Sequence, residues 1–270
     1  MTSLAKSNPL LEGRVALVTG AGRGLGRAIA IDLAQHGAKV ALSARSESEI
    51  EAVAAEIRSF GGQALAIPCD VTDPASVQSL VSGIGEAFHA PTILVNNAGA
   101  AESHKFVGHP DALWERMIAV NLTGTYRVTK ACAPGMLDAK WGRVINIGSI
   151  ASVTGAAYIA AYTAAKHGVL GLTRALAAEW VRKGITVNLV APGYVDTPMT
   201  DATIERIVGL TGRSQEAARD AIWSMSPQRR LVSPDEIAPL VRLLASEAGA
   251  SITGAVLPVD AGASAFASTG

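Results

Sequence analysis

Short apolar runs alternate along the chain with longer segments in which apolar residues recur every three or four positions. The short runs favour buried strands and occupy residues 14–19, 39–43, 63–68, 92–96, 143–148, 185–190 and 255–259. The longer segments favour helices, as where Leu25, Ile29 and Leu33 fall four residues apart before Gly37. Because strand and helix alternate, the strands are expected to be parallel and joined by right-handed crossovers.

This order predicts an α/β fold, a single-domain Rossmann fold with a doubly wound parallel sheet of seven strands and helices on both faces. Helix starts are predicted at Asp73 and Ser233, each of which precedes a proline. No linker or repeat divides the chain, so residues 1–270 are predicted to be one domain. Residues 197–230 have a helical pattern between loop-like ends. We expect either a substrate lid or a surface helical insertion there.

Composition narrows the classes of function. The 270 residues are 49% hydrophobic and 17% charged, which is typical of a globular protein. Lys+Arg and Asp+Glu balance at 23 each, so no overall positive field favours nucleic acid or an anionic membrane. Residues 1–14 are polar and lack the apolar core of a signal peptide, and no apolar run is long enough to span a membrane. A cytoplasmic protein is expected.

Cysteine and histidine positions give no sign of a metal site. Cys69 and Cys132 lie far apart without metal-ligand spacing and are expected to be buried, reduced thiols. The histidines also lack ligand spacing, and His167 is expected to face a different side of its helix from Lys166. No metal is predicted.

A glycine-rich segment follows the first strand. Residues 19–26 have the sequence TGAGRGLG and lead directly into a predicted helix. Glycines at this place let a diphosphate approach the free N–H groups of a helix N-terminus. The spacing is G-x-x-x-G-x-G, because Leu25 stands where G-x-G-x-x-G requires glycine. The strand–turn–helix context, more than the glycines, predicts a dinucleotide site.

The residues after the second strand indicate which dinucleotide binds. Sites for NAD place a carboxylate about 20 residues beyond the glycines, but Ala44, Arg45 and Ser46 occupy this position. Arg45 and Arg23 are suited to bind a 2′-phosphate through bidentate hydrogen bonds, and no acid is expected there to repel it. NADP is therefore favoured over NAD. The alternative is that both arginines are solvated loop residues.

Tyr162 and Lys166 lie four residues apart within residues 157–181, whose composition is helical, and so share one helix face. An ammonium within ~4 Å of the phenol, at an effective dielectric constant near 20, would favour phenolate by up to ~4 kcal/mol, or about three pKa units. The tyrosine would then titrate near neutrality and act as an acid or base. The alternative is a lysine that extends to solvent beside a half-buried tyrosine.

Two further polar residues support a catalytic site. Ser149 follows the strand at 143–148, at the carboxyl edge where open α/β sheets bind ligands. Its hydroxyl either hydrogen-bonds a substrate oxygen or only satisfies the turn backbone. Asn121 stands in a helical stretch from about Asp111, although asparagine is a poor helix former. Either a polar task in the interior or a surface position explains it.

Together these residues resemble the short-chain dehydrogenase/reductase family, in its original subgroup. The matching motifs run in family order from residue 14 to about residue 262: Thr19-Gly20-x-x-x-Gly24-x-Gly26, Asp70-Val71, Asn96-Asn97-Ala98-Gly99, Asn121, Ser149, Tyr162-x-x-x-Lys166, and Pro192-Gly193 followed by Thr197.

The resemblance implies a role for each matched residue. Tyr162 would donate and accept the proton, Lys166 would lower its pKa and hold the nicotinamide ribose, and Ser149 would orient the carbonyl. Asn121 would hold a water in a proton relay to Lys166. The implied NADP(H) contacts are Gly20, Arg23, Gly24, Leu25, Arg45, Ser46, Asp70, Val71, Asn97, Ala98, Gly99, Tyr162, Lys166, Pro192, Gly193, Val195 and Thr197.

The function expected from the residues and the resemblance is NADPH-dependent reduction of a ketone to a secondary alcohol, with a small-molecule carbonyl as substrate. Residues 211–232 are similar to lids of relatives that reduce 3-oxoacyl thioesters or polyketide intermediates. The alternatives are an NAD-dependent alcohol, sugar or sterol dehydrogenase that works oxidatively, and a nucleotide sensor without turnover. The resemblance also suggests a homotetramer that packs through residues 111–136 and 157–181.

Overall fold

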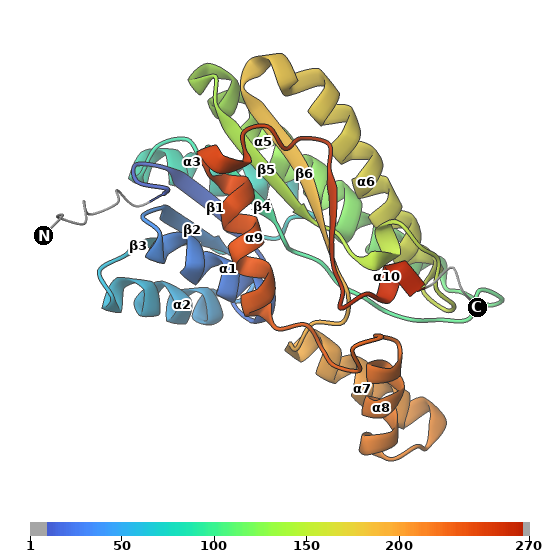
Figure 1. Cartoon of the computed structure of the whole chain (residues 1–270). Coiled ribbons are helices and arrows are strands. Elements are labelled where there is room, and N and C mark those ends of the chain that lie inside the picture. The colour runs from blue at the N-terminus through green and yellow to red at the C-terminus, as the bar shows by residue number, and fades with distance from the viewer. Residues whose placement is uncertain (1–9, 267–270) are drawn as a thin grey trace, which may run out of the picture.

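A seven-stranded parallel sheet forms the centre of the molecule in the computed structural model, which describes residues 10–266 (Figure 1). The strand order is β3-β2-β1-β4-β5-β6-β7, and every pairing is parallel. The strands are β1 (Val15–Thr19), β2 (Lys39–Ser43), β3 (Gln63–Ala66), β4 (Ile93–Asn96), β5 (Gly142–Ile147), β6 (Ile185–Pro192) and β7 (Val256–Val259). The predicted doubly wound fold is confirmed. Both ends of each predicted strand lie within two residues of the observed ends.

Helices cover both faces of the sheet. One face carries α1 (Gly24–Gln35), α2 (Glu47–Ser59) and α9 (Pro234–Ala245), and the other carries α3 (Pro74–Ala87), α5 (Gly124–Ala139) and α6 (Ala160–Trp180). Strand β1 shows why both faces are apolar. Ala16 and Val18 pack in the core under the first set of helices, and Val15 and Leu17 pack under the second.

Most predicted helix ends are confirmed. Gly37, with φ of +96°, follows the end of α1, and the side chains of Asp73 and Ser233 accept backbone N–H bonds at the starts of α3 and α9. The helix expected over 157–181 begins at Ala160, because Tyr158 has φ of +69° and cannot be helical. The helical stretch expected from about Asp111 is confirmed: α4 (Asp111–Ile118) continues into α5 through a π-helical turn, η1 (Ala119–Thr123), which the sequence did not predict.

The carboxyl ends of β1 and β4 lie side by side at the point where the strand order reverses. From β1 the chain continues outward to β2 and β3, and from β4 it continues in the opposite direction. Open α/β sheets bind ligands at such a reversal. Residues 197–230 form α7 (Pro198–Thr211) and α8 (Gln215–Ser224), which project beyond the layers of the sheet in Figure 1.

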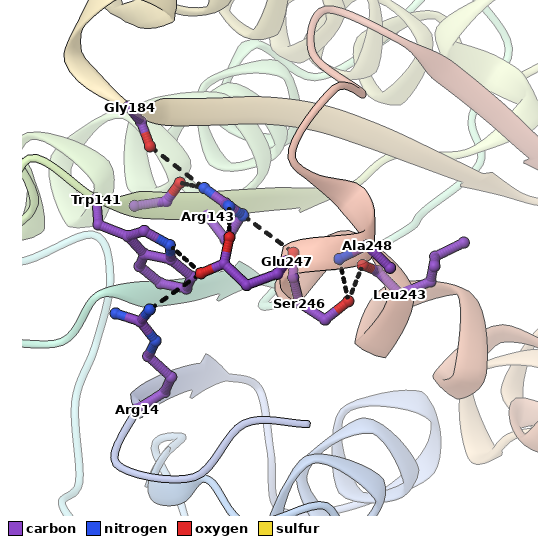
Figure 2. A network of polar contacts seen from close by, with 9 residues as sticks. Arg14, Trp141, Arg143, Gly184, Leu243, Ser246, Glu247 and Ala248 are labelled. Carbon is purple, nitrogen blue, oxygen red and sulfur yellow. Dashed lines mark hydrogen bonds and ion pairs between the residues drawn. The ribbon is translucent and has the colours of Figure 1, made fainter. Parts of the chain in front are cut away.

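At the opposite, amino edge of the sheet, Arg143 of β5 is buried in a polar network (Figure 2). Its guanidinium donates to the backbone oxygens of Gly142 (2.9 Å), Gly184 (3.2 Å) and Ser246 (3.3 Å) and to the carboxylate of Glu247 (3.4 Å). The ring of Trp141 lies between Arg143 and Arg14. The guanidinium carbon of Arg143 is 4.3 Å from the ring centroid, and that of Arg14 is 3.5 Å from it. Every nitrogen of the Arg143 guanidinium therefore has a partner.

Three sequence expectations concern the chain as a whole. None of the described helices is long and apolar enough to cross a membrane. Cys69 and Cys132 are both buried and free, as expected. Most of the polar N-terminal segment, for which no signal peptide is expected, lies outside the described residues.

Candidate active site

The glycine loop is shaped by close backbone contacts. Gly20 and Gly24 have φ of +64° and +54°, a backbone region that residues other than glycine rarely adopt. A Cβ on Gly20 would lie 2.9 Å from the amide nitrogen of Asn97, and one on Gly26 would collide with the carbonyl oxygen of Gly20. Backbone conformation at Gly20 and Gly24, and packing at Gly20 and Gly26, therefore favour glycine where the strand order reverses.

Thr19 and Asn97 hold this loop against the end of β4. The Thr19 hydroxyl accepts the backbone N–H groups of Asn97 and Ala98, both at 3.0 Å. The Asn97 amide donates in turn to the carbonyl oxygens of Thr19 (2.9 Å) and Gly20 (3.0 Å). The Asn97 side chain thus positions the glycine loop.

The N-terminus of α1 has the features of an anion site. Its N-cap residue, Arg23, makes no side-chain cap, and the first turn contains no acidic residue. The first N–H groups of a helix have no intrahelical acceptor, and the helix dipole favours negative charge there. This end of α1, with the glycine loop before it, fits the diphosphate of a dinucleotide.

Both predicted phosphate-binding arginines are exposed, but acids lie near them. Arg23 Nη1 is 3.6 Å from a carboxylate oxygen of Glu49, in the first turn of α2. The Thr72 hydroxyl and N–H lower the pKa of Asp70, and the charge of Arg45 lowers it further. The expectation that no acid is near these arginines is wrong. The acids come from the next helix and from the segment after β3, so only the fold brings them together.

Tyr162 and Lys166 lie on one side of α6, as the spacing predicts. Lys166 is 5% exposed, and its Nζ donates to the carbonyl oxygen of Ile147 (2.8 Å) and lies 5.7 Å from the centre of the Tyr162 ring. This burial is inconsistent with a lysine that extends to solvent. His167, by contrast, is exposed on another side of the helix.

The pKa shifts differ from those expected. Burial raises the pKa of Tyr162 and outweighs a hydrogen bond with Ser149 that lowers it, and Tyr194 raises it further. Burial also lowers the pKa of Lys166 to about 8. The expectation that the ammonium brings the phenol to neutrality is wrong in this structure. The Lys166 ammonium is held against Ile147 O. Removal from water disfavours both the Tyr162 phenolate and the Lys166 ammonium.

Ser149 fulfils its local role and keeps a donor. It follows β5 and caps a short 3-10 helix (Ile150–Ser152), where its Oγ accepts the N–H of Ala151 at 3.1 Å. A hydroxyl that accepts one bond still has its proton to donate. The turn function and a contact with a substrate oxygen are therefore compatible.

Asn121 is completely buried in the π-helical turn, so the surface explanation is wrong. Its amide nitrogen donates to the carbonyl oxygens of Ala100 (2.9 Å) and Met117 (3.0 Å), and its oxygen accepts the N–H of Ala100 (3.2 Å). A Cβ on Gly99 would lie 2.9 Å from the Asn121 oxygen and 3.8 Å from Lys166 Nζ. Gly99 therefore marks where Asn121 and Lys166 approach each other.

The remaining predicted cofactor residues lie around the same edge. Pro192 ends β6, the N–H of Gly193 donates to Val259 O, and a Cβ on Gly24 would be 3.1 Å from Thr197 Cγ2. Of the others, Leu25 is in the first turn of α1, Ser46 caps α2, Val71 packs against Gly124, and Val195 forms a bridge with Val232.

Some polar residues of this region were not indicated by the sequence. Tyr194 lies near enough to affect Tyr162, and Glu102 forms ion pairs with Arg116 and with Arg206 of α7. Asn146 was not indicated either: its side-chain oxygen accepts at 2.8 Å from the amide of Asn96, which belongs to the matched motif and is its partner across the sheet. Asparagine is uncommon in central strands, and this was the one available signal.

The described residues contain no cluster of three or more His, Cys, Asp or Glu side chains that would hold a metal ion.

Comparison with known proteins identifies the family. Residues 14–207 match the family model for short chain dehydrogenases. The chain belongs to this family. It is an oxidoreductase that acts on C=O or CH–OH groups. The family resemblance noted from its motifs is thus confirmed.

Several named proteins are similar to this short-chain dehydrogenase over nearly its whole length. It is 41% identical over 252 residues to the 3-oxoacyl-[acyl-carrier-protein] reductase FabG of Pseudomonas aeruginosa, covering 93% of this chain and 98% of that protein. It is 40% identical to the granaticin polyketide synthase putative ketoacyl reductase 1 of Streptomyces violaceoruber, covering 97% of both. Among solved structures, a single-residue variant of the actinorhodin polyketide ketoreductase with NADPH has a TM-score of 0.90 and 39% identity, covering 93% of this chain and 97% of that chain.

Proposed function

We propose that this protein is an NADPH-dependent ketoreductase whose substrates are 3-oxoacyl thioesters or polyketide-like ketones. The observation that carries the proposal is the convergence of Tyr162 and buried Lys166 with Ser149 at the carboxyl end of β5. Relatives named as FabG and as polyketide ketoreductases support both the cofactor and the substrate class. Because these relatives are named as reductases, the oxidative NAD-dependent alternative is not favoured.

The site residues fit a dinucleotide. The glycine loop and the N-terminus of α1 would hold the diphosphate, and Arg23 and Arg45 would hold the 2′-phosphate. When bound, the nucleotide supplies a hydride to the carbonyl carbon. The remaining predicted contacts, from Asp70 to Thr197, stay part of this proposal.

Proton transfer is assigned to Tyr162. Burial raises the pKa of its phenol, so the group is protonated at neutral pH, the form that reduction requires. Ser149, whose hydroxyl contacts the Tyr162 phenol, would turn its proton to the carbonyl oxygen and so orient and polarise it. The ammonium of Lys166 would stabilise the phenolate that remains after the proton leaves, and Asn121 would hold the relay that restores the proton.

Other parts of the proposal concern organisation. The chain would act as one catalytic domain in which α7 and α8, at residues 197–230, serve as the substrate lid. Exposed Tyr126 and Leu137 on α5 support a homotetramer that packs through α4, α5 and α6. Two buried free thiols, Cys69 and Cys132, support a location in the cytoplasm. Light scattering tests the oligomer, and a monomer would contradict it.

The experiment is NADPH oxidation with a short 3-oxoacyl thioester. Tyr162→Phe is expected to lower kcat by about 10³-fold, because the positioned acid is lost, while the Kd of NADPH changes far less, because Tyr162 is only one of many predicted contacts. Tyr158→Phe, at a tyrosine that is 60% exposed before α6, is the matched control and should retain activity. Equal rates for Tyr162→Phe and wild type would remove the proposed acid.

A further inference from the structure

Glu49 lies directly over the glycine loop. A Cβ built on Gly22 would be 2.8 Å from the Cβ of Glu49 and 2.9 Å from its Oε2. The other carboxylate oxygen, Oε1, is 3.6 Å from Arg23 Nη1. Glycine at position 22 therefore leaves room for a carboxylate beside the arginine assigned to the 2′-phosphate.

The position of this carboxylate differs from what its local sequence favours. Ser46 caps α2 and Glu49 is three residues later, the spacing of a capping box, in which the acid returns to the N-cap N–H. In α9 the same spacing gives that result: Glu236 accepts the N–H of Ser233 at 2.8 Å. For α2 the described contacts include only the Ser46 half of the box, and the Glu49 side chain extends to the loop instead.

The charges around the two arginines are balanced. Glu49 is paired with Arg23, and Asp70 is close enough to Arg45 to be affected by its charge. A 2′-phosphate that binds here meets two cations and two carboxylates. Arg23 and Glu49 are 69% and 39% exposed, so their pair is weak and an incoming anion can displace it.

We propose that Glu49 is a specificity-determining residue that competes with the 2′-phosphate for Arg23, and so limits the preference for NADP(H) over NAD(H). The inference rests on the proposed function, because it assumes that the dinucleotide binds at this loop. Repulsion between the carboxylate and the 2′-phosphate weakens binding of NADP(H). The same carboxylate is able to accept a hydrogen bond from a ribose hydroxyl of NAD(H).

The test measures binding and requires no turnover. Calorimetric titration would give the Kd of NADP⁺, NAD⁺, adenosine 2′,5′-bisphosphate and AMP for wild type and Glu49→Gln. We expect Glu49→Gln to bind NADP⁺ and the bisphosphate about fivefold tighter, since loss of one nearby exposed charge has an effect of this order. NAD⁺ and AMP should bind equally well or more weakly.

Two further variants separate local from general effects. Glu47→Gln removes the same charge from the same first turn of α2 but not from the contact with Arg23, and should change each Kd less than about twofold. Arg23→Gln should weaken NADP⁺ binding more in the Glu49→Gln background than in wild type, because Arg23 is then no longer shared. Glu49→Asp, which shortens the side chain, should give an intermediate Kd.

The outcomes are distinct. An unchanged ratio of NADP⁺ to NAD⁺ affinity in Glu49→Gln, an equal effect of Glu47→Gln, or additive effects of Arg23→Gln and Glu49→Gln would overturn this inference and leave the proposed function intact. Wild-type protein that binds neither dinucleotide would overturn both.

Discussion

Two buried cations lie toward opposite ends of β5, and their surroundings differ. Arg143, at the amino end, is 2% exposed and donates to three backbone carbonyls and the Glu247 carboxylate. Lys166, at the carboxyl end, is 5% exposed, and among the described residues its ammonium has one acceptor, Ile147 O. Burial lowers both pKa values, that of Lys166 to about 8, so the lysine titrates far nearer neutrality.

The comparison separates a structural cation from one available for chemistry. A guanidinium that makes four hydrogen bonds, at least one from each nitrogen, fixes backbone segments in place and has little left for a ligand. An ammonium with donors in reserve, held near a phenol, is poorly compensated in the protein alone but is able to contact a substrate or cofactor. Function at the carboxyl edge thus comes with incomplete local pairing.

The largest expected effect is on Arg143. Arg143→Met should lower the free energy of unfolding by about 4 kcal/mol, because three carbonyls lose partners at roughly 1 kcal/mol each and stacking on Trp141 contributes about 1 kcal/mol more. Denaturant unfolding measures it. Glu247→Gln keeps the shape of the exposed partner and should cost less than about 1 kcal/mol. Equal losses in both would contradict a role centred on the backbone carbonyls.

Lys166 should make stability depend on pH in the alkaline range. Its pKa is about 8 in the folded protein against 10.5 for an unperturbed lysine, so between these values the unfolded chain binds more protons. The free energy of unfolding of wild type should therefore rise relative to Lys166→Met as pH increases from 8 to 10.5, by about 3 kcal/mol. Denaturant titrations at several pH values test this, and a constant difference would contradict it.

Lys166 should also affect catalysis. Lys166→Met is expected to lower kcat for ketone reduction by about 10²-fold, since a charge near ~6 Å at an effective dielectric constant of about 20 contributes about 3 kcal/mol to phenolate stability. Arg143→Met, in contrast, should keep kcat per folded molecule. Steady-state rates corrected for the folded fraction test both, and a loss of kcat in Arg143→Met would remove the distinction.

The smallest effect is expected where α7 meets the carboxyl edge. Arg206 lies 3.5 Å from Glu102 and donates to Ser103 O at 2.7 Å, which joins α7 to the segment after β4. Arg206→Gln should raise KM about threefold with little change in kcat, because exposed ion pairs contribute at most about 1 kcal/mol. Arg219→Gln, on exposed α8, is the control. Equal KM values in all three proteins would show that this contact does not position the lid.

The sequence by itself determined the architecture, because hydrophobic periodicity and helix caps are local properties that the final fold uses consistently. Strand positions, the starts of α3 and α9 and the end of α1 follow from it. The shared helix face of Tyr162 and Lys166 and the glycine loop before α1 also follow from the sequence. The spacing of these motifs indicated the family as well.

Only the tertiary structure decided the electrostatics. Desolvation depends on what covers a side chain, so the raised pKa of Tyr162 and the lowered pKa of Lys166 are not readable from a spacing of four residues. The π-helical turn that buries Asn121 and the diversion of Glu49 to Arg23 likewise depend on segments distant in sequence. Which residues meet is set by the packing of helices against the sheet, and charge responds to all neighbours at once.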